Sequence, residues 1–273
     1  MTSLVAILAI TIACAALSGF VMARRWAFVG EGIGHSGFGG AGTAWMLACL
    51  FPALDDPKIP YLFVLGFLFV AAAGIAYLSR REKLTGDAAV GIFLVASVAW
   101  GFLGQSVYFY AKQAQPAGFT TLFFGQPSGI STPFAVCAVM VAVAVILAVI
   151  TMRKEMLAYC IDPLLAHTSG VRAGFIHYLL IGLIALVIAV GVNVVGTLLV
   201  TALLILPGAS AGKIANSMRA HTMICLVVAV TGSLGGFLLN LAYPFLPLGA
   251  MVVLTMCVMF VLSMIAGSRT KGA

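Results

Sequence analysis

The sequence has 273 residues, of which 63% are hydrophobic and only 8% are charged. A soluble domain carries about 25% charged residues, so this composition excludes an ordinary soluble protein and indicates a polytopic membrane protein. The net charge of +7 does not indicate a nucleic-acid partner, because the basic residues lie at the ends of apolar runs.

Apolar runs long enough to cross a membrane recur along the chain, separated by short polar or proline-containing turns. The predicted spans cover residues 4–23, 26–51, 61–78, 87–110, 133–152, 175–192, 222–241 and 248–266. We therefore expect an all-α integral membrane protein with a single transmembrane domain over residues 1–273. It would be a bundle of eight full transmembrane helices plus one short broken or re-entrant segment, or eight to nine spans.

The short segment comes from the apolar run 174–211, which is too long for one span and barely long enough for two. We expect a first break near Asn193–Gly196, with Asn193 as a candidate to satisfy the broken backbone. A second break is expected at Pro207-Gly208, because proline interrupts the helical hydrogen-bond ladder. The segment 195–207 would then either cross the membrane at a tilt or re-enter it.

The basic residues predict the orientation of the chain. Twelve of the fourteen lysines and arginines fall at alternating turns: Arg24, Arg25, Arg80, Arg81, Lys83, Arg153, Lys154, Arg172, Lys213, Arg219, Arg269 and Lys271. The positive-inside rule places these turns in the cytoplasm, so we expect the N-terminus outside and the C-terminus inside. No basic stretch precedes the first span, so we expect it to be retained rather than cleaved as a signal peptide.

The predicted span 26–51 contains an acid, an imidazole and seven glycines between Gly30 and Gly42. Glu31 and His35 are four residues apart, so on a helix they share one face. Ionisable side chains inside a span usually face a bundle interior or a water-filled path, where they mark a substrate or ion route. The glycines allow other helices or a ligand to approach closely. The alternative interpretation is a small-residue packing helix with one incidental polar pair.

Two further stretches carry candidate functional residues. Asp87 opens the span 87–110, where it either complements the helix dipole or has a functional role. In the inner loop, Asp162 and Pro163 predict a helix start, with Asp as the N-cap and Pro at the first helical position. Ser169-Gly170 predict its end. A short amphipathic helix there is suited to docking a cytosolic partner, and the alternative is a plain connecting helix.

Several motifs occur in order along the chain. An arginine pair, Arg24-Arg25, precedes Gly30-Glu31-x-x-x-His35; Leu122-Phe123-Phe124-Gly125 and Asp162-Pro163-Leu164-Leu165-Ala166 follow; and residues 194–211 form a Val-Gly-x-Leu-Leu run with a Pro near its end. Together, this ordered set resembles the permease subunits of ATP-binding-cassette importers for zinc, manganese and iron. Glu31 stands where the family usually has Asp, and Val95 stands where zinc-type members often have His.

The resemblance implies a fold and a site. It implies a homodimer of this subunit, or a heterodimer with a paralogous permease, in the bacterial cytoplasmic (inner) membrane. The pathway would lie at the two-fold axis, where Glu31 and His35 of both copies form a transient site for the transported divalent cation. Asp87 is the next candidate, as a supporting cation group. Carboxylate and imidazole ligands suit manganese, iron and zinc, and we expect no tightly bound cofactor.

The resemblance also implies partners. A cytosolic ATP-binding subunit would dock on the inner loop through four residues: Asp162, Pro163, Ala166 and Gly170. An external metal-binding protein would deliver the cation. The chain contains no Gly-x-x-x-x-Gly-Lys-Ser/Thr loop, so ATP hydrolysis must lie in a separate partner chain and this subunit is expected to be no enzyme.

Two other functions are compatible with a polar pair inside a membrane. The main alternative is a self-sufficient secondary metal-ion carrier or channel driven by ion gradients, whose polar residues could look similar. A membrane-embedded metallohydrolase would need a ligand cluster with a general base, such as His-Glu-x-x-His. The four histidines are scattered and supply no such cluster, so this class is the least favoured.

Overall fold

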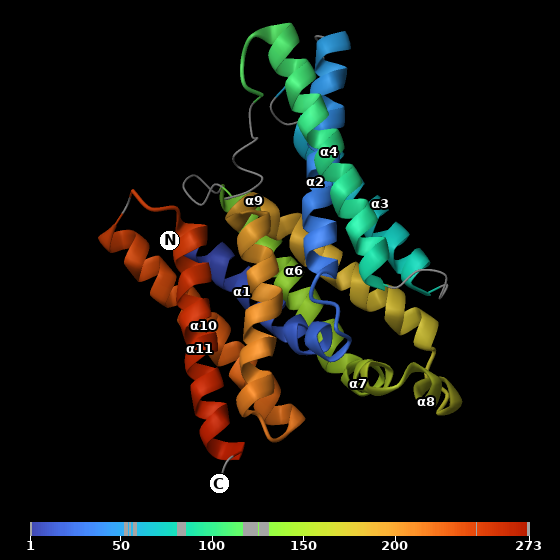
Figure 1. Cartoon of the computed structure of the whole chain (residues 1–273), viewed down its shortest axis with the longest axis vertical. Helices are drawn as coiled ribbons and strands as arrows, with labels where there is room; N and C mark the ends of the chain where they lie inside the picture. The colour runs from blue at the N-terminus through green and yellow to red at the C-terminus, as the bar shows by residue number, and fades with distance from the viewer. Residues whose placement is uncertain are drawn as a thin grey trace.

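The computed structural model describes residues 2–51, 54, 56, 59–80, 86–116, 125, 131–243 and 245–271. This described part is helical and contains no strand (Figure 1). Its helices are α1 Thr2–Ala23, α2 Val29–Leu50, α3 Ile59–Arg80, α4 Gly86–Lys112, α6 Thr132–Thr151, α7 Arg153–Ile161, α8 Pro163–Thr168, α9 Ala173–Ile214, α10 Met218–Ala242 and α11 Leu248–Lys271. The predicted Leu122-Phe123-Phe124 part of one motif lies outside the described residues.

The predicted all-helical membrane fold is confirmed. Seven of the described helices are long and apolar enough to cross a membrane: α1, α3, α4, α6, α9, α10 and α11. α2 is as long as α1, but its glycines, Glu31 and His35 make it less hydrophobic. The predicted spans begin and end within one or two turns of the observed helices, except that span 175–192 is only the first part of α9, which continues past a turn at Gly196 to Ile214.

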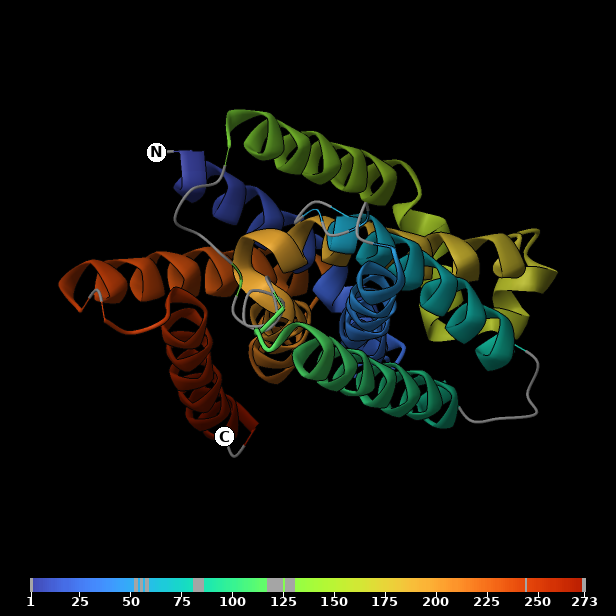
Figure 2. The same ribbon diagram turned by 90° about the horizontal axis from the view of Figure 1, so that it is seen from above.

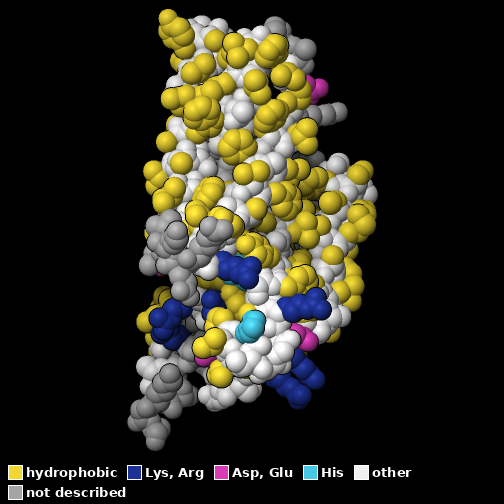
Figure 3. Space-filling model, turned by 90° about the vertical axis from the view of Figure 1, so that its right-hand side faces the viewer, with side chains coloured by type: hydrophobic (Ala, Val, Ile, Leu, Met, Phe, Trp, Pro, Cys, Tyr) yellow, Lys and Arg dark blue, Asp and Glu magenta, His cyan; other side chains and the backbone are white. Residues whose placement is uncertain are grey.

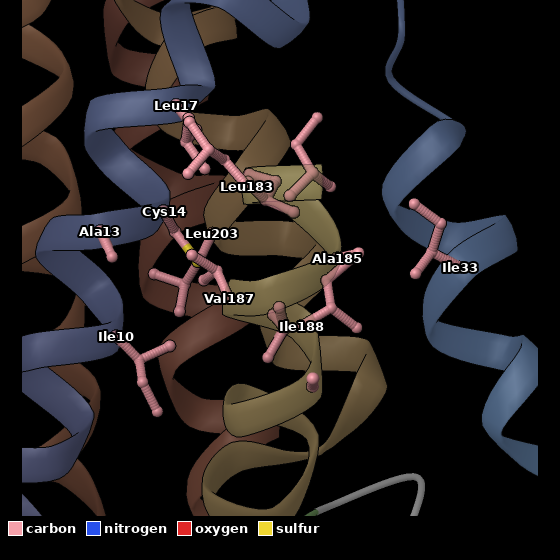
Figure 4. Close-up of a cluster of buried hydrophobic side chains, with 14 of the residues drawn as sticks. Ile10, Ala13, Cys14, Leu17, Ile33, Leu183, Ala185, Val187, Ile188 and Leu203 are labelled. Atoms are coloured by element: carbon pink, nitrogen blue, oxygen red, sulfur yellow. The ribbon is translucent and has the colours of Figure 1, made fainter. Parts of the chain in front are cut away.

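The hydrophobic core lies between α1 and α9, which bury the largest shares of their surfaces among the candidate spans. Seen from above, α6 and α4 lie on opposite flanks, with α1, α2 and α9 between them (Figure 2). Figure 4 shows the centre of this core, where side chains of α1 interdigitate with those of α9: Ile10, Cys14, Leu17, Leu183, Ile188 and Leu203. The remaining helices expose many large apolar side chains, as expected for a surface in contact with lipid.

The longest helix, α9, turns back on itself at Gly196, whose φ of 82° and ψ of 165° lie outside the helical region (Figure 1). The turn brings Gly191 and Val200 together, so that a Cβ at Gly191 would lie 2.5 Å from Val200 Cγ2. Gly125, with φ of 70°, packs against the same turn, and a Cβ there would lie 2.5 Å from Gly196 N. The predicted break near Asn193–Gly196 is therefore confirmed.

Two details predicted for this run are wrong. α9 continues through Pro207-Gly208 to Ile214 instead of breaking there. The N–H of Gly208 donates to Oγ of Ser18 in α1 over 2.8 Å, so the neighbouring helix supplies a hydrogen bond beside the proline. Asn193 does not bridge the break either, because its Nδ2 lies 3.5 Å from the carbonyl oxygen of Ala189, one turn earlier.

The glycines of α2 bring other backbones close to it. A Cβ at Gly42 would lie 2.8 Å from Gly101 Cα in α4, and a Cβ at Gly104 would lie 2.4 Å from Gly42 Cα. On another side, a Cβ at Gly40 would lie 2.4 Å from the carbonyl oxygen of Phe63 in α3. Association of membrane helices depends on such close packing, because lipid is as apolar as the helices themselves.

We expect Gly104→Ala to destabilise the protein by about 1–3 kcal/mol. The added methyl group would clash with the backbone of Gly42, which cannot move aside as a side chain could by changing rotamer. The measurement is the thermal unfolding midpoint in detergent. Gly91→Ala is the matched control on the same helix, since a Cβ there meets nothing within 4 Å. Equal unfolding midpoints for the two variants would show that the α2–α4 crossing is looser than described.

We expect Gly196→Ala to cost about 1–3 kcal/mol, because its backbone conformation is essentially restricted to glycine. Gly182→Ala in the same helix is the control, since it is helical and a Cβ there meets nothing within 4 Å. Chemical denaturation of both variants measures the difference. A Gly196→Ala variant as stable as Gly182→Ala would contradict the sharp turn in α9.

Candidate functional site

Glu31 and His35 lie on one face of α2, one turn apart, as their spacing predicted. Gly30 faces Leu204 of α9, and Gly32 faces Val90 of α4. Helical geometry places Glu31 between these two directions, in the sector between α9 and α4. Both Glu31 and His35 are half-buried, so this sector is partly open within one copy of the chain.

Two contacts set the orientation of the His35 ring. Its Nδ1 lies 3.1 Å from the carbonyl oxygen of Glu31, and its ring stacks on Phe38 with centroids 5.8 Å apart. A carbonyl can only accept, so Nδ1 is the donor in this bond and, in the neutral ring, Nε2 carries the lone pair. Neutral imidazole with one nitrogen donating to a carbonyl is the form that commonly binds metals.

The turn of α9 places the polar side chain of Thr197 next to α2. Thr197 follows the turn and packs against Gly34, where a Cβ would lie 3.7 Å from Thr197 Cβ. Thr197 Oγ1 and Asn193 Oδ1 are buried atoms with no hydrogen-bond partner. Sequence reasoning did not select Thr197 as a site residue. The signal that could have found it is a pair of polar residues flanking a glycine inside an otherwise apolar run.

The structure does not bring Asp87 into a cluster with the other candidates. Asp87 is exposed in the first turn of α4. Among the described residues, no group of three His, Cys, Asp or Glu side chains could hold a metal ion. One copy of the chain therefore offers a carboxylate and an imidazole. Divalent cations take four or more ligands, so this pair alone is suited to a transient, incomplete coordination.

The predicted short helix of the inner loop is confirmed as α8. Asp162 is its N-cap, and the carboxylate accepts hydrogen bonds from Leu164 N at 2.7 Å and Leu165 N at 3.3 Å. Pro163 occupies the first turn. Ala166, expected among the docking residues, is 2% exposed and instead anchors the helix against the bundle.

The end of α8 is also as predicted. Gly170 has φ of 85°, its N–H donates to His167 O over 3.1 Å, and Val171 N–H donates to Ala166 O over 3.0 Å. This pair of bonds is a Schellman motif, in which glycine takes the left-handed position. Ile161 and Leu165 are 81% and 62% exposed, so α8 and the residues before it present an apolar surface to the outside of the bundle.

Comparison with known proteins places this architecture among transport proteins. The family model described as the ABC 3 transport family matches residues 1–267. A probable iron transport system membrane protein of Haemophilus influenzae is 26% identical, over 96% of this chain and 91% of its own length. The manganese transport system membrane protein MntC of Halalkalibacterium halodurans is 27% identical, over 96% of this chain and 85% of its own length.

A solved structure shows the same fold. The chain is similar to PsaBC from Streptococcus pneumoniae in complex with Fab, with a TM-score of 0.76 and 25% sequence identity. The similarity covers 96% of this chain and 89% of that chain. The two chains therefore share their overall architecture over nearly the whole length.

We expect Asp162→Ala to speed hydrogen exchange at the amides of Leu164 and Leu165 about fivefold, because loss of a helix N-cap costs ~1 kcal/mol. Asp162→Asn is the matched control, since asparagine caps a helix about as well as aspartate. Exchange followed by mass spectrometry on the purified chain measures both. The same acceleration in both variants would mean that the carboxylate charge, rather than the cap, stabilises α8.

Proposed function

The chain belongs to the ABC 3 transport family, and from this premise we propose that it is the membrane-spanning permease subunit of an ATP-driven importer whose cargo is manganese, iron or zinc. The observation that carries the proposal is the pairing of Glu31 and His35 on a half-buried face of a helix inside a membrane protein of this family. The names of the relatives support a divalent metal as cargo, since they include iron and manganese transport systems.

The cation site is proposed to form between two copies of the subunit, or between this subunit and a paralogous permease. One copy supplies a carboxylate and an imidazole on a sector that its own helices leave partly open. A second copy would bring the same pair and raise the number of protein ligands to four. A site assembled across an interface can also be taken apart again, which transport requires. Asp87, exposed in the first turn of α4, would attract the cation along its route.

The membrane topology is proposed from the helices and the charges. Counting α2 as a span, and the two halves of α9 as two, gives eight full helices and one shorter segment, residues 197–214, that returns across the membrane. Non-helical backbone at membrane depth, as at Gly196, is tolerated where it is buried in protein or lines a cavity. The positive-inside rule then puts the N-terminus outside and α8 in the cytoplasm of a bacterial inner membrane.

ATP hydrolysis is proposed to occur in a separate cytosolic subunit that docks on α8. Asp162 and Gly170 cap the two ends of α8. Pro163 occupies its first turn and Ala166 is buried against the bundle, so α8 is a well-ordered helix that can transmit a movement of the partner. The exposed side chains of Leu165 in α8 and of Ile161 at the end of α7 would enter an apolar groove of the partner. An external metal-binding protein would deliver the cation at the opposite end of the bundle.

Radiometal uptake by cells that express this chain with its neighbouring ATP-binding subunit tests the proposal. We expect Glu31→Gln and His35→Ala each to reduce uptake roughly tenfold or more, because each variant removes a protein ligand and weakens binding of the cation. Glu31→Asp is the conservative control and is expected to keep uptake, since it keeps the carboxylate. Manganese, iron and zinc are compared to identify the cargo.

Membrane levels of every variant are measured by immunoblot, so that lost uptake is not confused with lost protein. Uptake that persists without the ATP-binding subunit would favour a secondary carrier driven by ion gradients. Full uptake by both Glu31→Gln and His35→Ala would leave the pair as packing residues and overturn the site.

A further inference from the structure

An open cavity of about 510 Å³ lies where α1 and α3 end and where α8 meets the start of α9. Its polar lining comes from Arg24, Arg80, Tyr159, His167 and His177, together with Ser79. None of the candidate cation residues lines this cavity, whereas α8 contributes Pro163, Leu164 and His167 to its wall. On the corresponding side of the molecule, lysine, arginine and histidine side chains gather in the lower part, below a largely hydrophobic surface (Figure 3).

The cavity is basic, and no Asp or Glu is among the residues that line it. Arg24 Nε is a buried atom with no hydrogen-bond partner. The guanidinium of Arg80 lies close to Gly174, where a Cβ would be 2.8 Å from Arg80 Nη2. The guanidinium carbon of Arg80 lies 5.8 Å from the ring centroid of Tyr178. Guanidinium groups bind phosphate with several donors at once, so two of them in one cavity favour a phosphate-bearing ligand.

The end of α1 directs Arg24 into the cavity. Arg25 has φ of 57°, a left-handed conformation that is unfavourable for a residue with a Cβ. Its N–H donates to Met22 O over 3.1 Å, and Trp26 N–H donates to Val21 O over 2.9 Å, which caps the helix. Arg24 and Trp26, on either side of this turn, both line the cavity.

A hydrogen-bond network holds the walls together. His177 Nε2 donates to the carbonyl oxygen of Ala76 over 2.9 Å, and its Nδ1 accepts from the Tyr159 hydroxyl over 2.7 Å. The guanidinium carbon of Arg24 lies 4.6 Å from the centroid of the Tyr159 ring. Burial raises the pKa of Tyr159, so the hydroxyl keeps its proton and remains a donor. Three helices, α3, α7 and α9, are thereby fixed around a preformed cavity.

The border of the cavity is apolar and aromatic. Tyr178 of α9 is 39% exposed, and its ring centroid lies 5.8 Å from the guanidinium carbon of Arg80, while Trp26 is itself part of the lining. Leu164 of α8 lines the cavity and is 74% exposed. Aromatic side chains gather at membrane–water interfaces, and basic pockets between transmembrane helices on the cytoplasmic side bind anionic lipid headgroups.

We propose that this cavity binds the phosphate of an anionic phospholipid, such as phosphatidylglycerol, through Arg24 and Arg80, with the acyl chains against Leu164 and Tyr178. The apolar border favours a lipid over a soluble phosphate, which would gain nothing from it. Assignment to the cytoplasmic leaflet rests on the membrane orientation proposed above. A lipid held there would tie α8 to the bundle and to the membrane surface at the same time.

Native mass spectrometry of the full chain in detergent, titrated with phosphatidylglycerol or phosphatidylcholine, tests the proposal. We expect a clear preference for phosphatidylglycerol and a loss of roughly fivefold in its affinity for each arginine removed, in Arg80→Gln and in Arg24→Gln/Arg80→Gln. Lys213→Gln/Arg219→Gln is the matched control, because it removes the same charge from exposed cytoplasmic-side residues that do not line the cavity.

Arg24 packs on Trp26 and Tyr159, so His167→Glu provides a variant that keeps this packing and adds a negative charge to the lining from an exposed position. It is expected to lose phosphatidylglycerol binding while circular dichroism shows an unchanged fold. Equal binding of both lipids, unchanged binding by folded His167→Glu, or an equal loss in the Lys213/Arg219 control would overturn the proposal.

Inorganic phosphate is added as a competitor in a separate titration. Displacement of phosphatidylglycerol by millimolar phosphate would identify a site for a soluble anion and overturn the assignment to a lipid. The measurements need neither a transported metal nor an ATP-binding subunit, so a negative result here leaves the transport proposal standing.

Discussion

Gly42 of α2 meets Gly101 and Gly104 of α4 so closely that a Cβ at any of these positions would touch backbone. In a membrane, this kind of contact replaces the hydrophobic effect as the source of helix association, because lipid and helix are equally apolar. With glycines facing α3, α4 and α9, three neighbours come close enough to surround α2 on most sides. Between Val29 and Gly42, Glu31 and His35 are the two side chains of α2 that stay partly exposed.

The bend of α9 also depends on glycines that allow backbones to approach closely. The chain reverses direction at Gly196, and the backbone of Gly125 packs directly against this turn, where a Cβ would not fit. The reversal leaves Thr197 Oγ1 buried without a partner, and Thr197 packs against the same helix that carries His35. Polar backbone and side chains at this depth are costly in lipid, so their presence beside the ionisable pair is most simply explained by a polar path.

α8 and the basic cavity beside it are the parts of the molecule that we propose contact other molecules. α8 is short but capped at both ends, and its buried Ala166 anchors it to the bundle. One side of α8 exposes Leu165, next to the exposed Ile161 at the end of α7, for a protein partner, while another side lines the basic cavity. A movement of α8 would reach α7 and α9, its neighbours along the chain, and through the Tyr159–His177–Ala76 hydrogen bonds it would reach α3.

The sequence by itself determined the membrane class, the positions of nearly all helices and the caps of α8, because these depend on local hydropathy and on residues close together in the chain. It also placed Glu31 and His35 on one face, since a four-residue spacing on a helix requires it. The tertiary structure decided what depends on neighbours. Ser18 of α1 supplies a hydrogen bond to Gly208 where α9 continues through Pro207, and Asp87 lies exposed in the first turn of α4. The cavity between Arg24 and Arg80 exists only because distant helix ends meet.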